Sequence, residues 1–173
     1  MLLFAEICNT TSMTVALVCN GMTLVGTISR SSLLSSGGIS DSMICLSSGG
    51  GWAASSRNTR QWVRVTAGRL YTLTTVETQG RGGGSIEWVT YYKLQYGINE
   101  LDVNTRYVMD DTVSGPGGQY GQPRIFVANI DANTMVVHNL PEGLVASVIT
   151  LRPTAWVGRI ALRFEVRGCI NNG

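Results

Sequence analysis

Residues 79–85 form a loop in which a single charged side chain stands among glycines. They read Gln-Gly-Arg-Gly-Gly-Gly-Ser, which places Arg81 directly before Gly82 and Gly83. Glycines let a ligand come close to the backbone, and a guanidinium can donate paired hydrogen bonds to a carboxylate, a phosphate or sugar hydroxyls. Arg81, Gly82 and Gly83 are therefore candidates for ligand contact. A solvated loop arginine is the alternative interpretation.

Three further residues complete this candidate set. Trp52 follows a second run of glycines, residues 49–51, and an indole ring can stack on a sugar or insert at a membrane interface. Ile86 directly follows the loop of Arg81, and Arg57 adds a second guanidinium shortly after Trp52. For Trp52 the alternative is that the ring packs beneath its own short loop.

The sequence offers no catalytic or metal-binding pattern. His138 is the single histidine, and no G-x-S-x-G motif or suggestively spaced carboxylate pair accompanies it. Asn129, Asp131 and Asn133 alternate like the start of a calcium loop, but the rest of that loop is missing, so a side-chain-stabilised turn is favoured. We predict that the chain is not an enzyme and uses no metal or cofactor.

The cations do not form a nucleic-acid surface. The net charge is +2, and Lys93 is the only lysine, so almost every cation is an arginine suited to bidentate pairing. The sequence contains no run of basic residues and no basic residues interleaved with aromatic ones. A nucleic-acid partner is therefore not expected.

The four cysteines favour disulfide bonds over a metal site. Cys8, Cys19, Cys45 and Cys169 contain no C-x-x-C pair, and three pairings are possible. The sequence Asn9-Thr10-Thr11 is an acceptor for N-glycosylation. Both observations indicate a secreted context.

The elements that must position the candidate residues are short strands. Near the C-terminus, Ile160, Leu162, Phe164 and Val166 alternate with Ala161, Arg163, Glu165 and Arg167, which is the period of a strand buried on one face. We expect Arg163 and Glu165 to form a structural network with Arg152. Residues 88–96 alternate in the same way, and 112–123 form a loop rich in Gly and Pro. Shorter strands are predicted at 39–44, 62–65, 70–78, 124–127, 135–137 and 146–151. Many short strands without a helical period indicate a β-sandwich or β-barrel.

The first 38 residues are assigned to a poorly determined lead-in or a fragment of a longer precursor. Apolar residues near the start are interrupted by Glu6 and by polar residues 9–12, and no basic segment precedes them, so they make a poor signal peptide. Residues 31–38, rich in Ser and Gly, are interpreted as a flexible join. The folded domain is then expected over residues 39–173.

Several of these segments, in this order, resemble the discoidin domain family, also called the coagulation factor V/VIII type C domain. The resemblance covers roughly residues 37–169. The segments that carry it are Ile39-Ser40-Asp41-Ser42-Met43-Ile44, Trp62-Val63-Arg64-Val65, Thr78-Gln79-Gly80-Arg81, Trp88 to Tyr96, Phe126 with Asn129 and Asp131, Leu151-Arg152-Pro153 with Trp156, and Ile160 to Cys169.

The resemblance implies a distorted jelly-roll β-barrel or sandwich of about eight antiparallel strands, like that of galactose-binding domains. It implies a disulfide between the first and last cysteines of the domain, here Cys19 and Cys169, and a binding surface made of loops at one end of the barrel. Family members are non-catalytic adhesion modules, secreted or on the cell surface. They bind glycans, anionic phospholipid membranes, collagen or other proteins.

The chain departs from the family pattern between Ser48 and Trp62, where it is shorter and one binding loop is missing. We therefore expect glycan binding through the loops around Trp52 and Arg81. Binding to anionic phospholipid membranes or to a matrix protein such as collagen is the alternative. A single weak site would need several copies, through oligomers or tandem domains, to bind usefully.

Overall fold

The computed structural model describes residues 15–20, 23–24, 26–35, 41–46, 48–104, 106–110 and 121–171. These residues form eleven strands and one 3₁₀ helix, with no α-helix among them, and every strand pair is antiparallel. The elements are β1 (Val15–Ala16), β2 (Cys19–Asn20), β3 (Thr23–Leu24), β4 (Thr27–Arg30), η1 (Asp41–Ile44), β5 (Trp52–Ala53), β6 (Val63–Gln79), β7 (Trp88–Gly97), β8 (Phe126–Val127), β9 (Val136–Asn139), β10 (Val145–Val157) and β11 (Ala161–Ile170).

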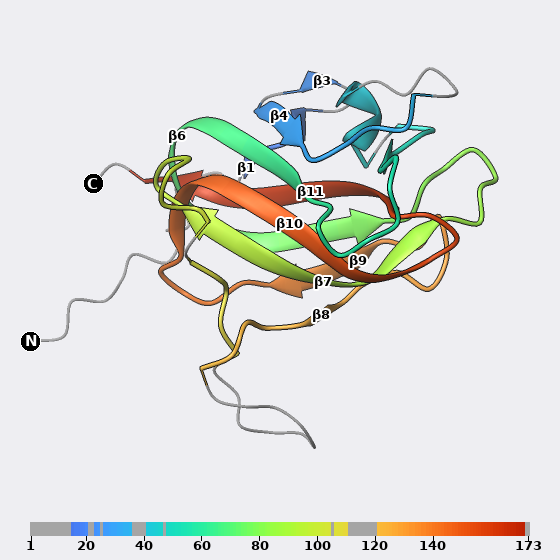
Figure 1. The fold of residues 1–173 in the computed structure, drawn as a ribbon. Coiled ribbons are helices and arrows are strands. Elements are labelled where there is room, and N and C mark those ends of the chain that lie inside the picture. Colours follow the sequence, from blue (N-terminus) through green and yellow to red (C-terminus); the bar gives the residue numbers. More distant parts are fainter. Residues whose placement is uncertain are drawn as a thin grey trace, which may run out of the picture.

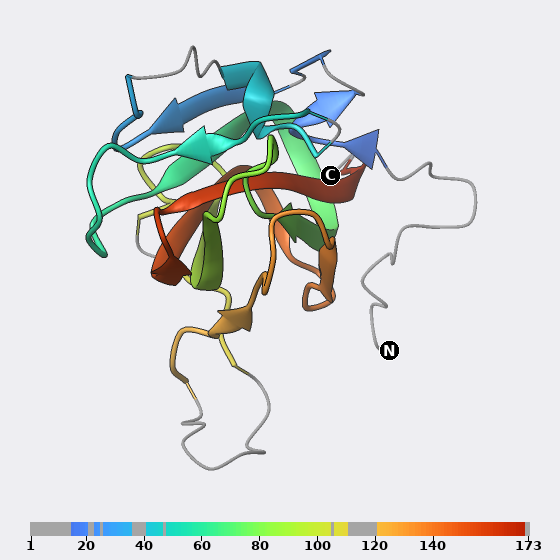
Figure 2. The same cartoon turned by 90° about the vertical axis from the view of Figure 1, so that its right-hand side faces the viewer.

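The long strand β6 belongs to both layers of the fold. Its first residues, from Val63 to Thr66, pair with β4 and β10, and β10 pairs in turn with β7, which carries β8 at the edge. Its last residues pair with β11 and β9, and β11 carries β1 and β5. The sheet therefore folds over on itself along β6 and encloses a core (Figures 1 and 2). The predicted all-β fold is confirmed.

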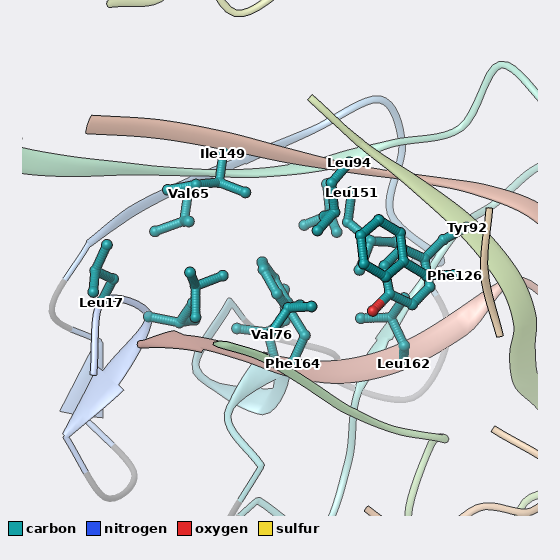
Figure 3. Close-up of a cluster of buried hydrophobic side chains, with 14 of the residues drawn as sticks. Leu17, Val65, Val76, Tyr92, Leu94, Phe126, Ile149, Leu151, Leu162 and Phe164 are labelled. Carbon is teal, nitrogen blue, oxygen red and sulfur yellow. The ribbon is translucent and has the colours of Figure 1, made fainter. Parts of the chain in front are cut away.

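The two layers bury apolar side chains against each other (Figure 3). Side chains from the first half of β6, from β7 and from β10 face those of β11 and of the second half of β6, as the alternation in the sequence predicts. Burial contributes roughly 1.5–3 kcal/mol for each large aliphatic or aromatic side chain. Tyr92 and Phe126 stack in parallel with ring centroids 5.1 Å apart. Fully buried members of this core include Val65, Val76, Leu94, Ile149, Leu151, Leu162 and Phe164.

The polar face of β11 is mostly buried, and its partners are only partly those expected. Arg167, whose side chain is partly exposed, forms an ion pair with Glu77 on β6, in which its Nε lies 2.6 Å from Oε1. Glu165 accepts hydrogen bonds from the backbone N–H of Val18 and of Val166. Arg152 donates to the side chain of Gln95, so it lies in a separate contact. Arg152, Arg163 and Glu165 thus have structural contacts with different partners, and these contacts do not join them into the single network that was predicted.

Two predictions near the start of the chain need correction, and a third, at 112–123, lies mostly outside the described residues. Residues 41–44 form the helix η1, not a strand, and residues 39 and 40 lie outside the described residues. Ile44 is buried although it does not belong to a strand. A short apolar run looks the same in sequence whether it forms a buried strand or a buried helical turn. Of the predicted join at 31–38, residues 31–35 are described, and they hydrogen-bond to β5 and to Trp62. Of the predicted loop at 112–123, residues 112–120 lie outside the described residues.

Part of the segment assigned to a lead-in packs with the domain. β1 pairs with β11, β4 pairs with β6, and Leu17 and Val18 are buried in the core. These strands have two to four residues each, too short for a clear alternation in sequence. The packed structure therefore begins before residue 39.

Both cysteines whose side chains are described form disulfide bonds. Cys45 and Cys169 are disulfide-bonded and buried, and the described residues contain no free cysteine. Cys8 and the side chain of Cys19 lie outside the described residues, so the pairing of Cys19 with Cys169 stays a prediction. Among the described residues, no helix has the length and apolar character needed to cross a membrane.

Candidate functional site

Four loops meet at the end of the barrel where β6 ends, β7 begins and β10 turns into β11. We call them the loop end; it comprises residues 48–51, 80–87, 129–134 and 158–160, and it lies at the right of Figure 1. The backbone N–H of Gly82 donates to Gly50 O at 2.7 Å, which joins the first two loops. Gly80 lies against Ala132, and Gly158 lies against Ile86, so the other two loops are in contact as well.

Arg163 on β11 anchors three of these loops from inside the protein. Its Nε donates to Gly80 O at 2.9 Å, its Nη1 to Ser48 O at 2.9 Å, and its Nη2 to Ala132 O at 2.7 Å. A longer bond runs from Nη1 to Leu46 O at 3.2 Å. The residue is only 6% exposed, and this burial lowers the pKa of its guanidinium. One side chain therefore fixes the relative positions of three loops.

Several glycines of the loop end serve packing between loops. A Cβ on Gly82 would lie 2.6 Å from Gly49 O, and one on Gly80 would lie 2.7 Å from the Cα of Ala132. Gly82 is buried, so its expected role as a ligand contact is wrong, because its missing side chain makes room for a neighbouring loop. Gly83 and Gly84 are exposed, with φ angles of 72° and 75° that favour glycine.

Arg81 belongs to a group of three charged side chains at the loop end. Its Nη1 lies 2.7 Å from Glu87 Oε2, and Glu87 Oε1 lies 3.5 Å from Arg159 Nε. Each side chain keeps about a fifth of its surface exposed. We call Arg81, Glu87 and Arg159 the charged triad. A hydroxyl group both donates and accepts hydrogen bonds, and the triad offers donors and an acceptor side by side.

Two members of the triad were not predicted from the sequence. Glu87 is six residues after Arg81, at the start of β7, and Arg159 lies in the turn between β10 and β11. The spacing of Arg81 and Glu87 across a glycine loop was a usable signal, since such a loop can fold back on itself. The backbone N–H of Arg81 does bond to Glu87 O at 3.0 Å. Nothing in the local sequence points to Arg159.

An exposed aliphatic surface accompanies the charged triad. Ile86 is 72% exposed, and Ile130 in the loop 129–134 is 80% exposed. Val157 is partly exposed at the end of β10, directly before Gly158. Gly158 packs against the backbone of Ile86. Aliphatic side chains next to polar ones suit a ligand with an apolar face and a polar rim.

Trp52 is not part of an accessible surface. The ring is 2% exposed, and its Nε1–H donates to Ser32 O at 2.9 Å. β5, which carries it, pairs with β11 through Leu162, so the side chain is in the core. The prediction of an indole platform is therefore wrong, and the alternative that the ring packs beneath its loop is correct.

The predicted site residues thus separate into two groups. Arg81, Gly83 and Ile86 share the loop 80–87 and keep exposed surface, whereas Trp52 and Gly82 are buried. Arg57 is exposed on the neighbouring loop 54–62. That loop touches the triad through a bond from Arg159 Nη1 to Ala54 O at 3.4 Å.

The residues that suggested calcium or catalysis have structural partners. The Asn129 side-chain amide donates to the carbonyls of Thr78 and Thr134, and His138 Nε2 lies 2.6 Å from Val127 O, with its ring edge-on to Phe126. No cluster of three or more His, Cys, Asp or Glu side chains suited to a metal occurs in the part of the chain that the structure describes.

Asp131 stabilises the loop 129–134, and its titration provides a test. Its carboxylate accepts hydrogen bonds from the backbone N–H of Asn133 and Thr134 and from the Thr134 hydroxyl, and these bonds lower the pKa of the carboxyl group. The native state therefore binds fewer protons than the unfolded state, and the resulting stability is present above about pH 4 and is lost as the pH falls through the folded pKa. We expect the carboxyl carbon resonance of Asp131 to titrate with a pKa below the ordinary value of an aspartate.

The control for this titration is the variant Asp131→Asn, which cannot ionise. Its stability should fall below that of the unmodified protein at neutral pH, and the difference should shrink on acidification. A midpoint at or above the ordinary value of an aspartate would contradict this account.

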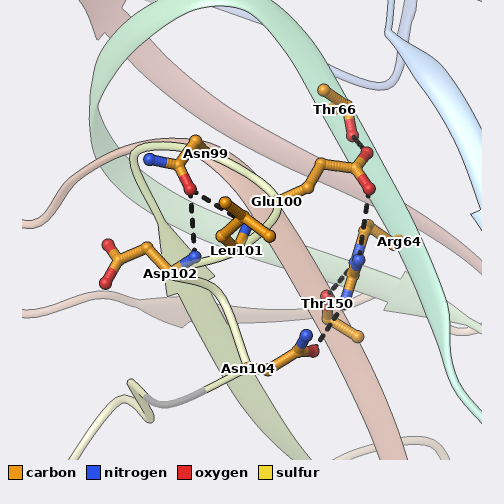
Figure 4. Close-up of polar contacts among 8 residues, drawn as sticks. All are labelled: Arg64, Thr66, Asn99, Glu100, Leu101, Asp102, Asn104 and Thr150. Carbon is orange, nitrogen blue, oxygen red and sulfur yellow. Dashed lines mark hydrogen bonds and ion pairs between the residues drawn. The ribbon is translucent and has the colours of Figure 1, made fainter.

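A second polar cluster lies away from the loop end and is fully engaged (Figure 4). Arg64 on β6 donates to Thr150 Oγ1 and to Asn104 Oδ1, each at 2.8 Å, and its Nη1 lies 3.5 Å from Glu100 Oε2. The Thr66 hydroxyl donates to the same carboxylate. Arg64 is buried, so this cluster ties the loop after β7 to the sheet and does not form a binding surface.

The chain is similar to known proteins in sequence and in fold. A family model described as "F5/8 type C domain" matches residues 27–166. Retinoschisin of Takifugu rubripes is 32% identical over 120 residues, which are 69% of this chain and 39% of that protein. The chain therefore spans about two fifths of the curated relative that it matches.

Two solved structures show the same fold. Discoidin II of Dictyostelium discoideum superposes with a TM-score of 0.63 at 22% identity, over 90% of this chain and 58% of that one. The family 32 carbohydrate-binding module from C. perfringens NanJ, solved in complex with galactose, gives a TM-score of 0.56 at 13% identity, over 90% of this chain and 99% of that one. At these identities the likeness concerns the fold alone.

Proposed function

Because this chain belongs to the F5/8 type C domain family, we propose that its loop end is a non-catalytic recognition surface for glycans, carried by a secreted or cell-surface protein. The observation that carries the proposal is the charged triad of Arg81, Glu87 and Arg159 beside the exposed Ile86. The predicted resemblance to the discoidin family is confirmed by the family match. The glycan itself is the proposed step.

The physical match between this surface and a sugar is direct. Neighbouring hydroxyls of a pyranose can accept from the guanidinium of Arg81 and donate to the carboxylate of Glu87. Because Arg81 and Glu87 are held by each other at 2.7 Å, little side-chain freedom is lost when a ligand binds. The aliphatic side chain of Ile86 can cover the apolar C–H face of the ring.

The rigidity of the surrounding loops supports the same proposal. Arg163 fixes the loops that carry Gly80, Ser48 and Ala132, so the donors and acceptors of the loop end are held in place before a ligand arrives. The galactose complex of the family 32 module supports a sugar as ligand for this fold. We expect weak binding at a single site, which several copies of the domain would strengthen.

Mutation of the triad tests the proposal. We expect the chain, displayed in several copies on a glycan array, to bind a subset of sugars. Arg81→Gln and Glu87→Gln should each weaken that binding by about tenfold or more, because each removes a charge-assisted hydrogen bond. Unfolding midpoints should be measured for both variants to separate loss of contact from loss of fold.

Arg69→Gln is the matched control, since Arg69 is exposed on β6 near the C-terminal end of β11, away from the loop end. Glycan binding that persists at full strength in both triad variants would remove the site assignment. Flotation with phosphatidylserine vesicles and binding to immobilised collagen should run in parallel. Binding to either of these, with no glycan bound, would replace the glycan by the alternative ligand.

A further inference from the structure

The charges of the described residues are distributed unevenly between the two ends of the barrel. The loop end and the adjoining loop 54–62 carry more cations than anions, whereas the opposite end carries more anions than cations. At the first end the cations are Arg57, Arg60, Arg81 and Arg159 and the anions are Glu87 and Asp131. At the opposite end, in the middle of β6 at 67–70 and in the loops 98–106 and 140–144, the cations are Arg69 and Arg106 and the anions are Glu100, Asp102 and Glu142.

One of the two anions at the loop end is already engaged within its own loop. The carboxylate of Asp131 accepts three hydrogen bonds from Asn133 and Thr134. This carboxylate stabilises the turn and has little capacity left to accept hydrogen bonds from a ligand. Glu87 is the anion that lies in contact with the guanidiniums of Arg81 and Arg159.

Glu87 is shared between two guanidiniums and cannot neutralise both. Arg81 Nη1 lies 2.7 Å from Glu87 Oε2, but Arg159 Nε is 3.5 Å from Oε1 and makes no hydrogen bond within the described part of the chain. The bond from Arg159 Nη1 to Ala54 O is long, at 3.4 Å. The triad therefore carries a net positive charge. The Nε of Arg159 is itself buried, so the exposed fifth of this side chain is what can offer N–H groups to a ligand.

From this geometry we infer that the glycan recognised at the loop end is acidic and that its carboxylate or sulfate group binds at Arg81 and Arg159. The inference rests on the proposed function and narrows it to one class of sugar. Guanidinium groups are suited to these anions, because both present paired oxygens to a planar fork of N–H donors. Arg57 on the adjoining loop adds to the attraction at longer range.

A pair of oligosaccharides that differ by one acidic group tests the inference. Lactose and 3′-sialyllactose, and a neutral disaccharide with its 6-O-sulfated form, should be titrated against the full chain at low and moderate salt. The acidic member should bind at least about tenfold more tightly than its neutral partner. This preference should shrink as salt is raised, because the interaction is between partly exposed charges.

Substitutions at Arg159 assign the preference to a residue. Arg159→Gln should reduce the acidic preference, measured as the ratio of the affinities for the acidic and the neutral sugar, to about twofold or less. Arg159→Lys keeps the charge and should keep most of the preference, and Arg69→Gln, at the opposite end, should keep all of it. Equal unfolding midpoints for Arg159→Gln and Arg159→Lys would show that the difference does not arise from folding.

The outcomes separate this inference from the function on which it rests. Equal binding of neutral and acidic sugars, or an acidic preference unchanged in Arg159→Gln, would overturn the inference and leave glycan recognition standing. Absence of binding to every glycan would overturn both. Binding to phosphatidylserine vesicles that depends on Arg159, with no acidic glycan bound, would also overturn it, because the anion would then belong to a lipid.

Discussion

Replacement of Arg163 by methionine is expected to lower the free energy of unfolding by about 3–5 kcal/mol. The variant would leave the carbonyl groups of Gly80, Ser48 and Ala132 without their donor inside the protein. A buried acceptor without a partner costs about 1–3 kcal/mol, and water entering the site would recover part of the total. Methionine has a similar length and leaves little empty volume, so the loss reports on the hydrogen bonds.

Chemical denaturation of the unmodified protein and the variant measures this loss. For a chain of this size we expect the melting temperature to fall by roughly 2–4 °C for each kcal/mol. Arg69→Met is the matched control, because Arg69 is exposed and its replacement should change stability by less than about 0.5 kcal/mol. A loss below about 1 kcal/mol for Arg163→Met would show that Arg163 does not anchor the loops.

Gly158→Ala is expected to destabilise the protein by about 3 kcal/mol and to displace the loop of Ile86. Two costs combine at this position. The residue has a φ of 65°, a conformation that alanine adopts only with strain. The added Cβ would also lie 2.3 Å from the carbonyl oxygen of Ile86, a backbone atom that cannot move without its loop. Glycan binding should weaken in the same variant, since Ile86 and Glu87 belong to the displaced segment.

Two other glycines separate the cost of the backbone conformation from the cost of the steric contact. Gly84 has a φ of 75°, but no atom lies within 4 Å of the place that a Cβ would take, so Gly84→Ala should cost only the conformational strain, about 1 kcal/mol. Gly68 has neither a positive φ nor a close neighbour, and Gly68→Ala should be nearly neutral. If Gly158→Ala and Gly84→Ala are equally stable, the contact with Ile86 has no energetic weight.

The fold was predictable where alternation persists over many residues. Leu162, Phe164 and Val166 on β11 are completely buried, and β7 follows its predicted bounds closely. Shorter segments were less certain. The predicted strands at 62–65 and 70–78 belong largely to the single strand β6, which runs from Val63 to Gln79 and continues through Gly68. The helix η1 and the short strand β4 carry no local signal of comparable strength.

The site was predictable only in part, because burial is decided by distant segments. Arg81 was identified from its glycine neighbours. Ile86 is exposed, as its position directly after the glycine loop suggests. Trp52 looks the same in sequence, but the pairing of its strand with β11, more than a hundred residues later, places it in the core. Arg159 meets Glu87 only because β10 and β11 turn back beside the start of β7.

Arg163 holds its three loops through main-chain carbonyl groups, and every amino acid supplies such a group. The side chains at positions 48, 80 and 132 contribute nothing to these bonds, so the anchor tolerates changes in loop sequence wherever the backbone path is kept. Binding preference and structural integrity are thereby controlled by different atoms of the same segments. Outward-facing residues of the loop end can therefore be exchanged to vary its ligand while Arg163 continues to hold the loops in place.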